Sequence, residues 1–410
     1  MSTIITKGMI GFEQALQFDI YKADGSLFLK KGVVIYNHSH IDAITDGTHY
    51  TLIDFDENGV RISEEEELDT TQYIEDIISR LEIAYNNFLT NGYNLIKDII
   101  VISAKLVDQL EETPDAMLGI IHMRTDLRYS IMRTLQNTIF TVLTARHMEW
   151  DKRRVIKLAS ASLTANLGMY MFQDELNNSD ELADWQKGMI KKHTIQSVKM
   201  LIGMGLKDKD WLQTVGFHHE MGDGSGYPNG LENNRISDEA KLLSIADRYG
   251  ARISSRGKRI SDDPHKTMRL FLDSENSPYD QNMVEHFIAE IGVYPPGLTV
   301  KLQNGDIAIV IERGINRAVP KVLAVWREDG TIYTPPLIRD TFQEEFHILI
   351  YHYAEDLHKI NANILWGENT NGQSIFRDGE HSISARTETS DDVRIVVTAD
   401  DDDEEDVTLF

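Results

Sequence analysis

The longest regular pattern in the sequence is helical, and it limits the fold more than any other feature. Apolar residues recur every three or four positions from Ile74 to Phe88 and again from Leu95 to Leu106, which is the spacing of one helix face. The Asn91-Gly92 pair between them is typical of a helix end. The same texture continues from residue 115 to about residue 290. We therefore predict a mainly α fold built on a helical bundle.

Segments with a different period flank this helical stretch. Near the N-terminus, Phe18–Tyr21 and Leu27–Leu29 enclose Asp24-Gly25, a strong hairpin signal. Beyond residue 291, apolar and polar residues alternate between turns at Asn304-Gly305 and Asp329-Gly330. This pattern predicts a small antiparallel sheet or barrel after the bundle.

These changes of pattern divide the chain into five predicted parts. They are a small β-rich N-terminal domain (1–66), a helical linker or helix pair (67–124), a helical domain (125–290), a small antiparallel β extension (291–350) and a C-terminal segment with an acidic tail (351–410). The unbroken acidic run Asp400–Asp406 repels itself, so we expect the tail to be disordered.

Composition excludes several classes of protein. The chain of 410 residues has no cysteine, which fits a reducing compartment and leaves only His and carboxylate side chains as metal ligands. A net charge of −25 argues against nucleic acid as a partner. No apolar run is long enough for a membrane span. The first residues lack the pattern of a secretory signal, so we expect a cytoplasmic protein.

Three histidines are predicted to share the inside of the bundle. His218 and His219 lie three and four residues after Val215, whose position with Trp211 marks an inward helix face. His193 follows an apolar residue by one turn on an earlier helix. Neutral imidazole is the commonest metal ligand in proteins, so the pattern indicates a metal site, and a satisfied helix end is the plainer alternative.

A carboxylate joins this set. Asp247 lies between Leu243 and Ala251 on one helix face, and a charged group that faces a core needs a partner. Two alternatives remain open from the residues alone. Asp247 completes a metal site with the histidines, or it pairs with an arginine.

Two further features are candidates for binding an anion. Gly224 and Gly226 would let backbone N–H groups approach a ligand closely, while Pro228 stiffens the exit of the loop. Arg252 and Arg256 continue a row of arginines spaced by four residues, which would suit phosphate. The plainer interpretation of that row is a solvated face with ion pairs.

In combination, these residues resemble the HD-GYP domain, a branch of the HD phosphohydrolase superfamily linked to the bacterial second messenger cyclic di-GMP. The agreement covers roughly residues 125–290 and is close in its second half. The matching pieces, in family order and spacing, are His193, His218-His219-Glu220, Asp223–Pro228, Ala246–Tyr249 and Arg256.

The first half departs from the family pattern. The family's early His falls on Gln136, and its His-Asp pair falls on Ala165 and Asn166. The lysine that follows that pair falls on Met169. In the family, the Asp of the pair bridges two metals that activate a hydroxide, and the resemblance implies that this chain has lost that half of the site.

The resemblance leaves two states of the metal site open. Either His193, His218 and His219 hold a single Fe or Mn ion that Asp247 or water completes, or no metal is present. It also implies a surface for ligand or phosphate made by these residues: Asp223, Gly224, Gly226, Tyr227, Pro228, Arg252 and Arg256.

Three functions follow as hypotheses. The leading one is a degenerate, catalytically impaired or inactive HD-GYP protein that acts as a regulatory or scaffold module, binding cyclic di-GMP, a related nucleotide or a protein such as a diguanylate cyclase. The second is an active phosphodiesterase that uses the reduced site of His193, His218, His219 and Asp247, so whether the chain is an enzyme stays open here. The third is a structural role in which the bundle is a homodimerisation platform and the helices of residues 71–112 supply the partner-facing surface.

Overall fold

A computed structural model gives the fold in two compact units, Met1–Leu68 and Asp69–Phe410. In the first unit it describes residues 3–5, 10, 16, 18–22, 27–35, 38–45 and 48–51. In the second it describes residues 69–179, 182–254, 261–272, 277–354, 357–367, 375–377 and 385–386. The acidic run predicted to be disordered lies outside these ranges.

The first unit is a small antiparallel sheet with one described helix, α1 (His38–Ile44). The strands are β1 (Thr3–Ile4), β2 (Ile20–Lys22), β3 (Leu27–Leu29) and β4 (His49–Thr51), in the spatial order β1-β4-β2-β3. Strands β2 and β3 pair antiparallel with Ile20 opposite Leu29, which confirms the predicted hairpin. The predicted turn residues lie outside the described ranges.

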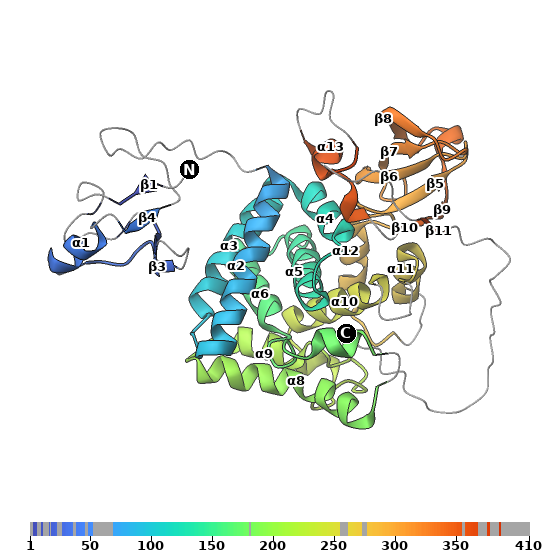
Figure 1. The fold of residues 1–410 in the computed structure, drawn as a ribbon. Coiled ribbons are helices and arrows are strands. Elements are labelled where there is room, and N and C mark those ends of the chain that lie inside the picture. Colours follow the sequence, from blue (N-terminus) through green and yellow to red (C-terminus); the bar gives the residue numbers. More distant parts are fainter. Residues whose placement is uncertain are drawn as a thin grey trace. The chain divides into compact units, whose positions relative to one another are not determined.

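The second unit is mainly helical, as predicted, and Figure 1 shows its helices packed into one bundle. The helices are α2 (Thr70–Asn91), α3 (Ile96–Glu112), α4 (Pro114–Met123), α5 (Tyr129–His147), α6 (Lys152–Thr164), α7 (Gln173–Asn177), α8 (Asp184–Gly203), α9 (Lys209–Phe217), α10 (Asp238–Ile253), α11 (Pro264–Leu272), α12 (Gln281–Ile291) and α13 (Ala362–Trp366). No described helix is long and apolar enough to cross a membrane.

The local sequence determines where helix α2 begins and ends. Asp69 and Gln72 form a reciprocal capping box at its start, and Gly92 adopts a left-handed conformation with φ of 64° at its end. The stripe predicted from Ile74 onward is buried. The helix end predicted at Asn91-Gly92 is therefore confirmed.

Helix α5 runs through the middle of the bundle and is buried along most of its length. Every residue from Arg133 to Ala145 is buried, and the helix packs against α4, α6, α10 and α12. Several of these residues are polar, including Arg133, Gln136 and Asn137. A polar face inside a bundle needs internal partners, and α6, α10 and the segments that follow them supply these.

The predicted meander after the bundle is a five-stranded antiparallel sheet. Its strands are β5 (Thr299–Leu302), β6 (Ile307–Glu312), β7 (Lys321–Trp326), β8 (Ile332–Asp340) and β9 (Ile348–Tyr351), in the order β8-β7-β6-β5-β9. A separate pair of short strands, β10 (Tyr353–Ala354) and β11 (Ala385–Arg386), follows.

The sheet is attached to the bundle by an ion-pair cluster and by one tryptophan. Arg313 follows β6 and pairs with Asp115 of α4 and with Glu290 of α12, the latter at 2.7 Å. The Trp366 indole N–H donates to the Ile311 carbonyl at 2.7 Å. A Cβ built on Gly119 of α4 would lie 2.1 Å from that indole ring. The tryptophan therefore requires a glycine at that point.

We predict that Gly119→Ala lowers the free energy of unfolding by about 1–3 kcal/mol, because the added methyl overpacks the indole contact. Gly188→Ala on α8 is the matched control, since nothing lies within 4 Å of its built Cβ. It should stabilise the helix by about 0.5–1 kcal/mol. Chemical denaturation of both variants measures the difference, and equal effects would contradict the packing argument.

Candidate metal centre

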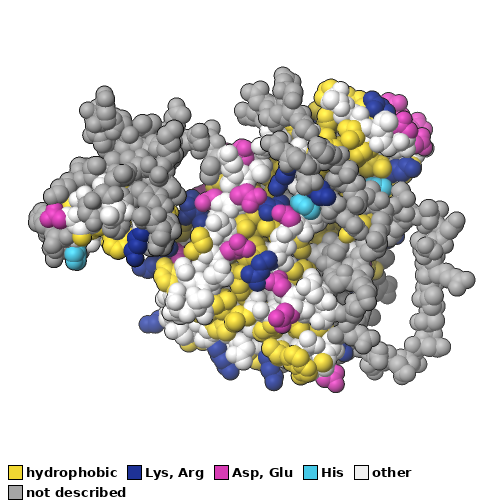
Figure 2. Space-filling view, in the orientation of Figure 1, with side chains coloured by type: hydrophobic (Ala, Val, Ile, Leu, Met, Phe, Trp, Pro, Cys, Tyr) yellow, Lys and Arg dark blue, Asp and Glu magenta, His cyan; other side chains and the backbone are white. Residues whose placement is uncertain are grey.

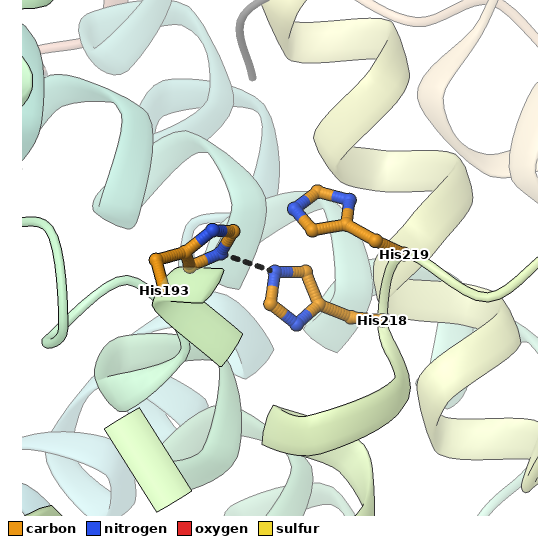
Figure 3. Close-up of side chains that lie close together, drawn as sticks. All are labelled: His193, His218 and His219. Carbon is orange, nitrogen blue, oxygen red and sulfur yellow. Dashed lines mark hydrogen bonds between the residues drawn. The ribbon is translucent and has the colours of Figure 1, made fainter. Parts of the chain in front are cut away.

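The three predicted histidines meet inside the bundle. His193 comes from the middle of α8, His218 caps the end of α9, and His219 is the next residue. All three are buried, and their ligand atoms lie within 4.8 Å of one another. Figure 3 shows the rings of His193 and His218 turned toward each other with His219 beside them. The sequence-based placement of these residues is thus reproduced by the fold.

The backbone fixes the tautomer of two of these rings. His193 Nδ1 lies 2.5 Å from the Ile190 carbonyl oxygen, and His218 Nδ1 lies 2.9 Å from the Val215 carbonyl oxygen. A carbonyl only accepts, so each Nδ1 carries the proton and donates it. The two Nε2 atoms, 3.4 Å apart, therefore present lone pairs to each other. Such an arrangement calls for a cation between or beside them.

Protonation of these rings is unfavourable, so a proton does not serve as that cation. Burial lowers the pKa of His193 to about 3 and the pKa of His218 to about 4. Burial also lowers the pKa of His219 well below its usual value, with the neighbouring His218 adding to the effect. The three rings are neutral near pH 7 and keep their lone pairs for a metal. This donor set fits a single divalent ion of the Fe, Mn or Zn type.

Asp247 lies near this cluster but its carboxylate already has partners. On α10, its Oδ1 accepts from Arg133 Nη2 at 3.0 Å and from Asn137 Nδ2 at 2.5 Å. Its Oδ2 is buried without a hydrogen-bond partner among the described residues. The arginine partner considered from the sequence therefore exists and comes from α5. A ligand role for Asp247 through Oδ2 stays a prediction.

The segment aligned with the family's His-Asp pair packs against α8. Ser197 of α8 donates to the Ala165 carbonyl at 2.7 Å and accepts from the Gly168 N–H at 2.8 Å. Gly168 approaches the His193 carbonyl so closely that a Cβ there would lie 2.5 Å from it. Ala165 and Asn166 are thus held beside the histidine helix, buried, and neither offers a negatively charged ligand.

Gln136, aligned with the family's early His, is also buried and neutral. Its Oε1 accepts from Ser254 Oγ at 3.1 Å and lies 3.4 Å from Arg133 Nη1. It is therefore engaged in the network around Asp247.

The glycine loop is built by local hydrogen bonds. Asp223 Oδ1 accepts from the backbone N–H of Ser225 at 2.9 Å and from its hydroxyl at 2.7 Å, and Gly224 has φ of +82°. A Cβ on Gly226 would lie 2.3 Å from the Met221 nitrogen, so only glycine fits there. The following Tyr227-Pro228 peptide bond is cis.

The loop is joined to the metal centre through its tyrosine. The Tyr227 ring lies 4.8 Å from the His219 ring, centroid to centroid. The Tyr227 N–H donates to the His219 carbonyl at 3.0 Å. The loop and the third histidine are therefore positioned together.

Glu220 is a structural residue that the sequence did not reveal. Its buried carboxylate accepts from the backbone N–H groups of Asn229 at 2.7 Å and Leu231 at 2.8 Å. It thereby closes the segment that contains the glycine loop. Its place in the His-His-Glu motif was the only signal, and the motif does not state this role.

The described arginines of the predicted row have partners inside the protein. Arg252 pairs with Asp262 at 3.1 Å, and Arg248 Nε donates to the Tyr279 hydroxyl at 3.1 Å. Helix α10 ends at Ile253. Ser254 already has extended backbone, with ψ of 133°. Arg256 itself lies outside the described residues.

The chain is similar in sequence to known proteins. Residues 94–283 match the family model described as an HD domain. The chain is 25% identical over 244 residues to a cyclic di-GMP phosphodiesterase of Pseudomonas aeruginosa, a match that covers 58% of this chain and 59% of the relative. It is also 25% identical over 185 residues to the cyclic di-GMP phosphodiesterase PdeB of Borreliella burgdorferi, covering 45% of this chain and 48% of the relative.

A solved structure of an HDG"Y"P protein from Bdellovibrio bacteriovorus is similar with a TM-score of 0.43 and 16% sequence identity, covering 70% of this chain and 97% of that one. The HD domain match and the two curated relatives support the resemblance of residues 94–283 to the HD-GYP family. Each match spans about half of the length of its curated relative, at 59% and 48%.

We predict that Glu220→Gln lowers the free energy of unfolding by about 1–3 kcal/mol, because one of the two buried N–H groups then faces an amide NH₂ instead of an acceptor. Thermal or chemical unfolding measures the loss of stability. The rate of limited proteolysis within residues 221–231 measures how readily the loop opens. Glu232→Gln, at an exposed position of the same segment, is the control. A Glu220→Gln variant as stable as Glu232→Gln would contradict the anchoring role.

Proposed function

We propose that this chain is a catalytically impaired HD-GYP protein that acts as a regulatory or scaffold module in cyclic di-GMP signalling. One observation carries the proposal. The three-histidine cluster and the glycine loop are complete, while Ala165 and Asn166 stand where the family's His-Asp pair aligns. The protein keeps the half of the site that binds and has lost the half that bridges metals.

In this proposal, a single metal ion is bound by His193, His218 and His219. An Fe or Mn ion there would supply positive charge and an acidified water molecule. The neighbouring side chains give little help to catalysis. Asn166 is neutral and a poor bridging ligand, Ala165 has no ligand atom, and Met169 offers no positive charge to a phosphate. The charge that develops on a phosphodiester during attack is therefore poorly stabilised.

The proposed ligand is cyclic di-GMP or a related nucleotide, because both curated relatives are named as cyclic di-GMP phosphodiesterases. The glycine loop, Asp223–Pro228, offers backbone groups next to the metal centre, and Arg252 is a half-buried cation on the neighbouring helix. A protein partner such as a diguanylate cyclase would dock at the same loop. Figure 2 shows that Lys and Arg are scattered over the visible face rather than gathered into a strip for nucleic acid.

A second candidate function is an active phosphodiesterase with one metal. The observation that favours it is the Oδ2 atom of Asp247, a buried carboxylate oxygen that has no hydrogen-bond partner among the described residues. That oxygen could complete the metal site or orient a water molecule. A measurement of cyclic di-GMP hydrolysis distinguishes the two candidate functions.

We predict that the purified chain, dialysed against Mn²⁺, retains one ion and that His218→Ala weakens its affinity about 10-fold or more, because one of three neutral ligands is removed. Elemental analysis and Mn²⁺ titration measure both values. His347→Ala is the control, since His347 is exposed in the segment after β8. Unchanged Mn²⁺ binding in His218→Ala would contradict the three-histidine site.

We also predict that cyclic di-GMP binds in calorimetry but stays intact. With Mn²⁺ or Fe²⁺ supplied, its hydrolysis by the chain should stay within the background set by His218→Ala, because the bridging carboxylate is absent. Hydrolysis on the order of 100-fold above that background would establish the second candidate instead. The absence of binding to cyclic di-GMP would remove the nucleotide version of the proposal.

A further inference from the structure

Arg133 is the least expected residue in the bundle. It lies in the first turns of α5 with its side chain 0% exposed, and arginine is almost never fully buried unless it is paired. Its Nη2 donates to the Asp247 backbone carbonyl at 2.5 Å and to Asp247 Oδ1 at 3.0 Å. Both contacts go to the same residue, so the guanidinium is fixed against one turn of α10.

That turn of α10 is shaped to receive the guanidinium. A Cβ built on Gly250 would lie 1.8 Å from Arg133 Nη1 and 2.9 Å from its Cζ. Any other residue at position 250 would displace the charged group. Glycine in a helix interior destabilises the helix relative to alanine. Gly250 therefore lowers the stability of α10, and its lack of a side chain leaves room for the guanidinium.

The other side chains that contact this pair are uncharged. Gln136 and Asn137 are buried, and Asn137 donates to the same carboxylate oxygen. Arg133 is the cation that hydrogen-bonds the Asp247 carboxylate. A second cation, Arg248, is the next residue of α10; its charge adds to the burial that lowers the pKa of His219, and its Nε donates to the Tyr279 hydroxyl at 3.1 Å. A further cation at Asp247 would meet the buried guanidinium at a short distance and in a medium of low polarity.

We propose that the Arg133 guanidinium, seated on Gly250, is the permanent cation of Asp247 and takes the place that a second metal ion would need. The centre then holds one ion, on the histidines, and the buried carboxylate is neutralised whether or not any metal is supplied. The one-ion count rests on the proposed three-histidine site. The pairing of Arg133 with Asp247 does not.

The first test is a double-mutant cycle in the presence of EDTA. Arg133→Met and Asp247→Asn each leave a buried charge without its partner, so each should lower the unfolding midpoint by on the order of 10 °C. The double variant removes both charges and should lose clearly less than the sum of the two. The ion pair of Arg80, which is exposed, and Asp76, which is half-buried, 2.7 Å apart on α2, is the matched control, and its variants should shift the midpoint little.

The second test counts ions in the unaltered protein, which needs no variant to fold. Titration with Mn²⁺, followed by electron paramagnetic resonance and elemental analysis, should saturate at one ion per chain. Saturation at two ions would overturn the proposal, and so would losses in the double-mutant cycle that simply add. No bound Mn²⁺ with losses that do not add would support the assignment of Arg133 and count against the three-histidine site instead.

Discussion

The centre of this protein is organised by two imidazole nitrogens that face each other without a proton between them. His193 and His218 both donate their Nδ1 protons to carbonyls of their own helices, which leaves their Nε2 atoms 3.4 Å apart. Burial makes protonation of either ring unfavourable near pH 7. Helices α8 and α9 thus bring together two electron pairs whose repulsion a metal ion would remove. The loop of Asp223–Pro228 contacts the His219 ring through the Tyr227 ring.

The bundle keeps a polar centre because α5 carries polar side chains on its buried surface. Arg133 and Asn137 of α5 donate to Asp247 of α10, and Gln136 Oε1 lies 3.4 Å from Arg133 Nη1. Arg133 Nε, Asn137 Oδ1 and Asp247 Oδ2 have no hydrogen-bond partner among the described residues. A buried carboxylate is costly unless it is paired, and Arg133 pairs with Asp247 without any metal ion.

Much of the fold was predictable, because local signals and tertiary packing agree. The capping residues of α2, the hairpin of β2 and β3 and the inward position of the three histidines follow from spacing and turn chemistry. The partner of Asp247 could not be chosen from the sequence, because Arg133 lies 114 residues away and its burial depends on the gap at Gly250. The anchoring role of Glu220 was hidden for a similar reason. Its carboxylate binds backbone groups of Asn229 and Leu231, which carry no side-chain signal.

We propose that half of a site like that of the HD-GYP family survives in this chain and that it binds one metal ion. Crystals of the full chain soaked in Mn²⁺ and measured at the manganese absorption edge would show where the ion lies. We expect a single anomalous peak among His193, His218 and His219, with Arg133 still bound to Asp247. A second peak beside Asp247, or no peak at the histidines, would contradict it.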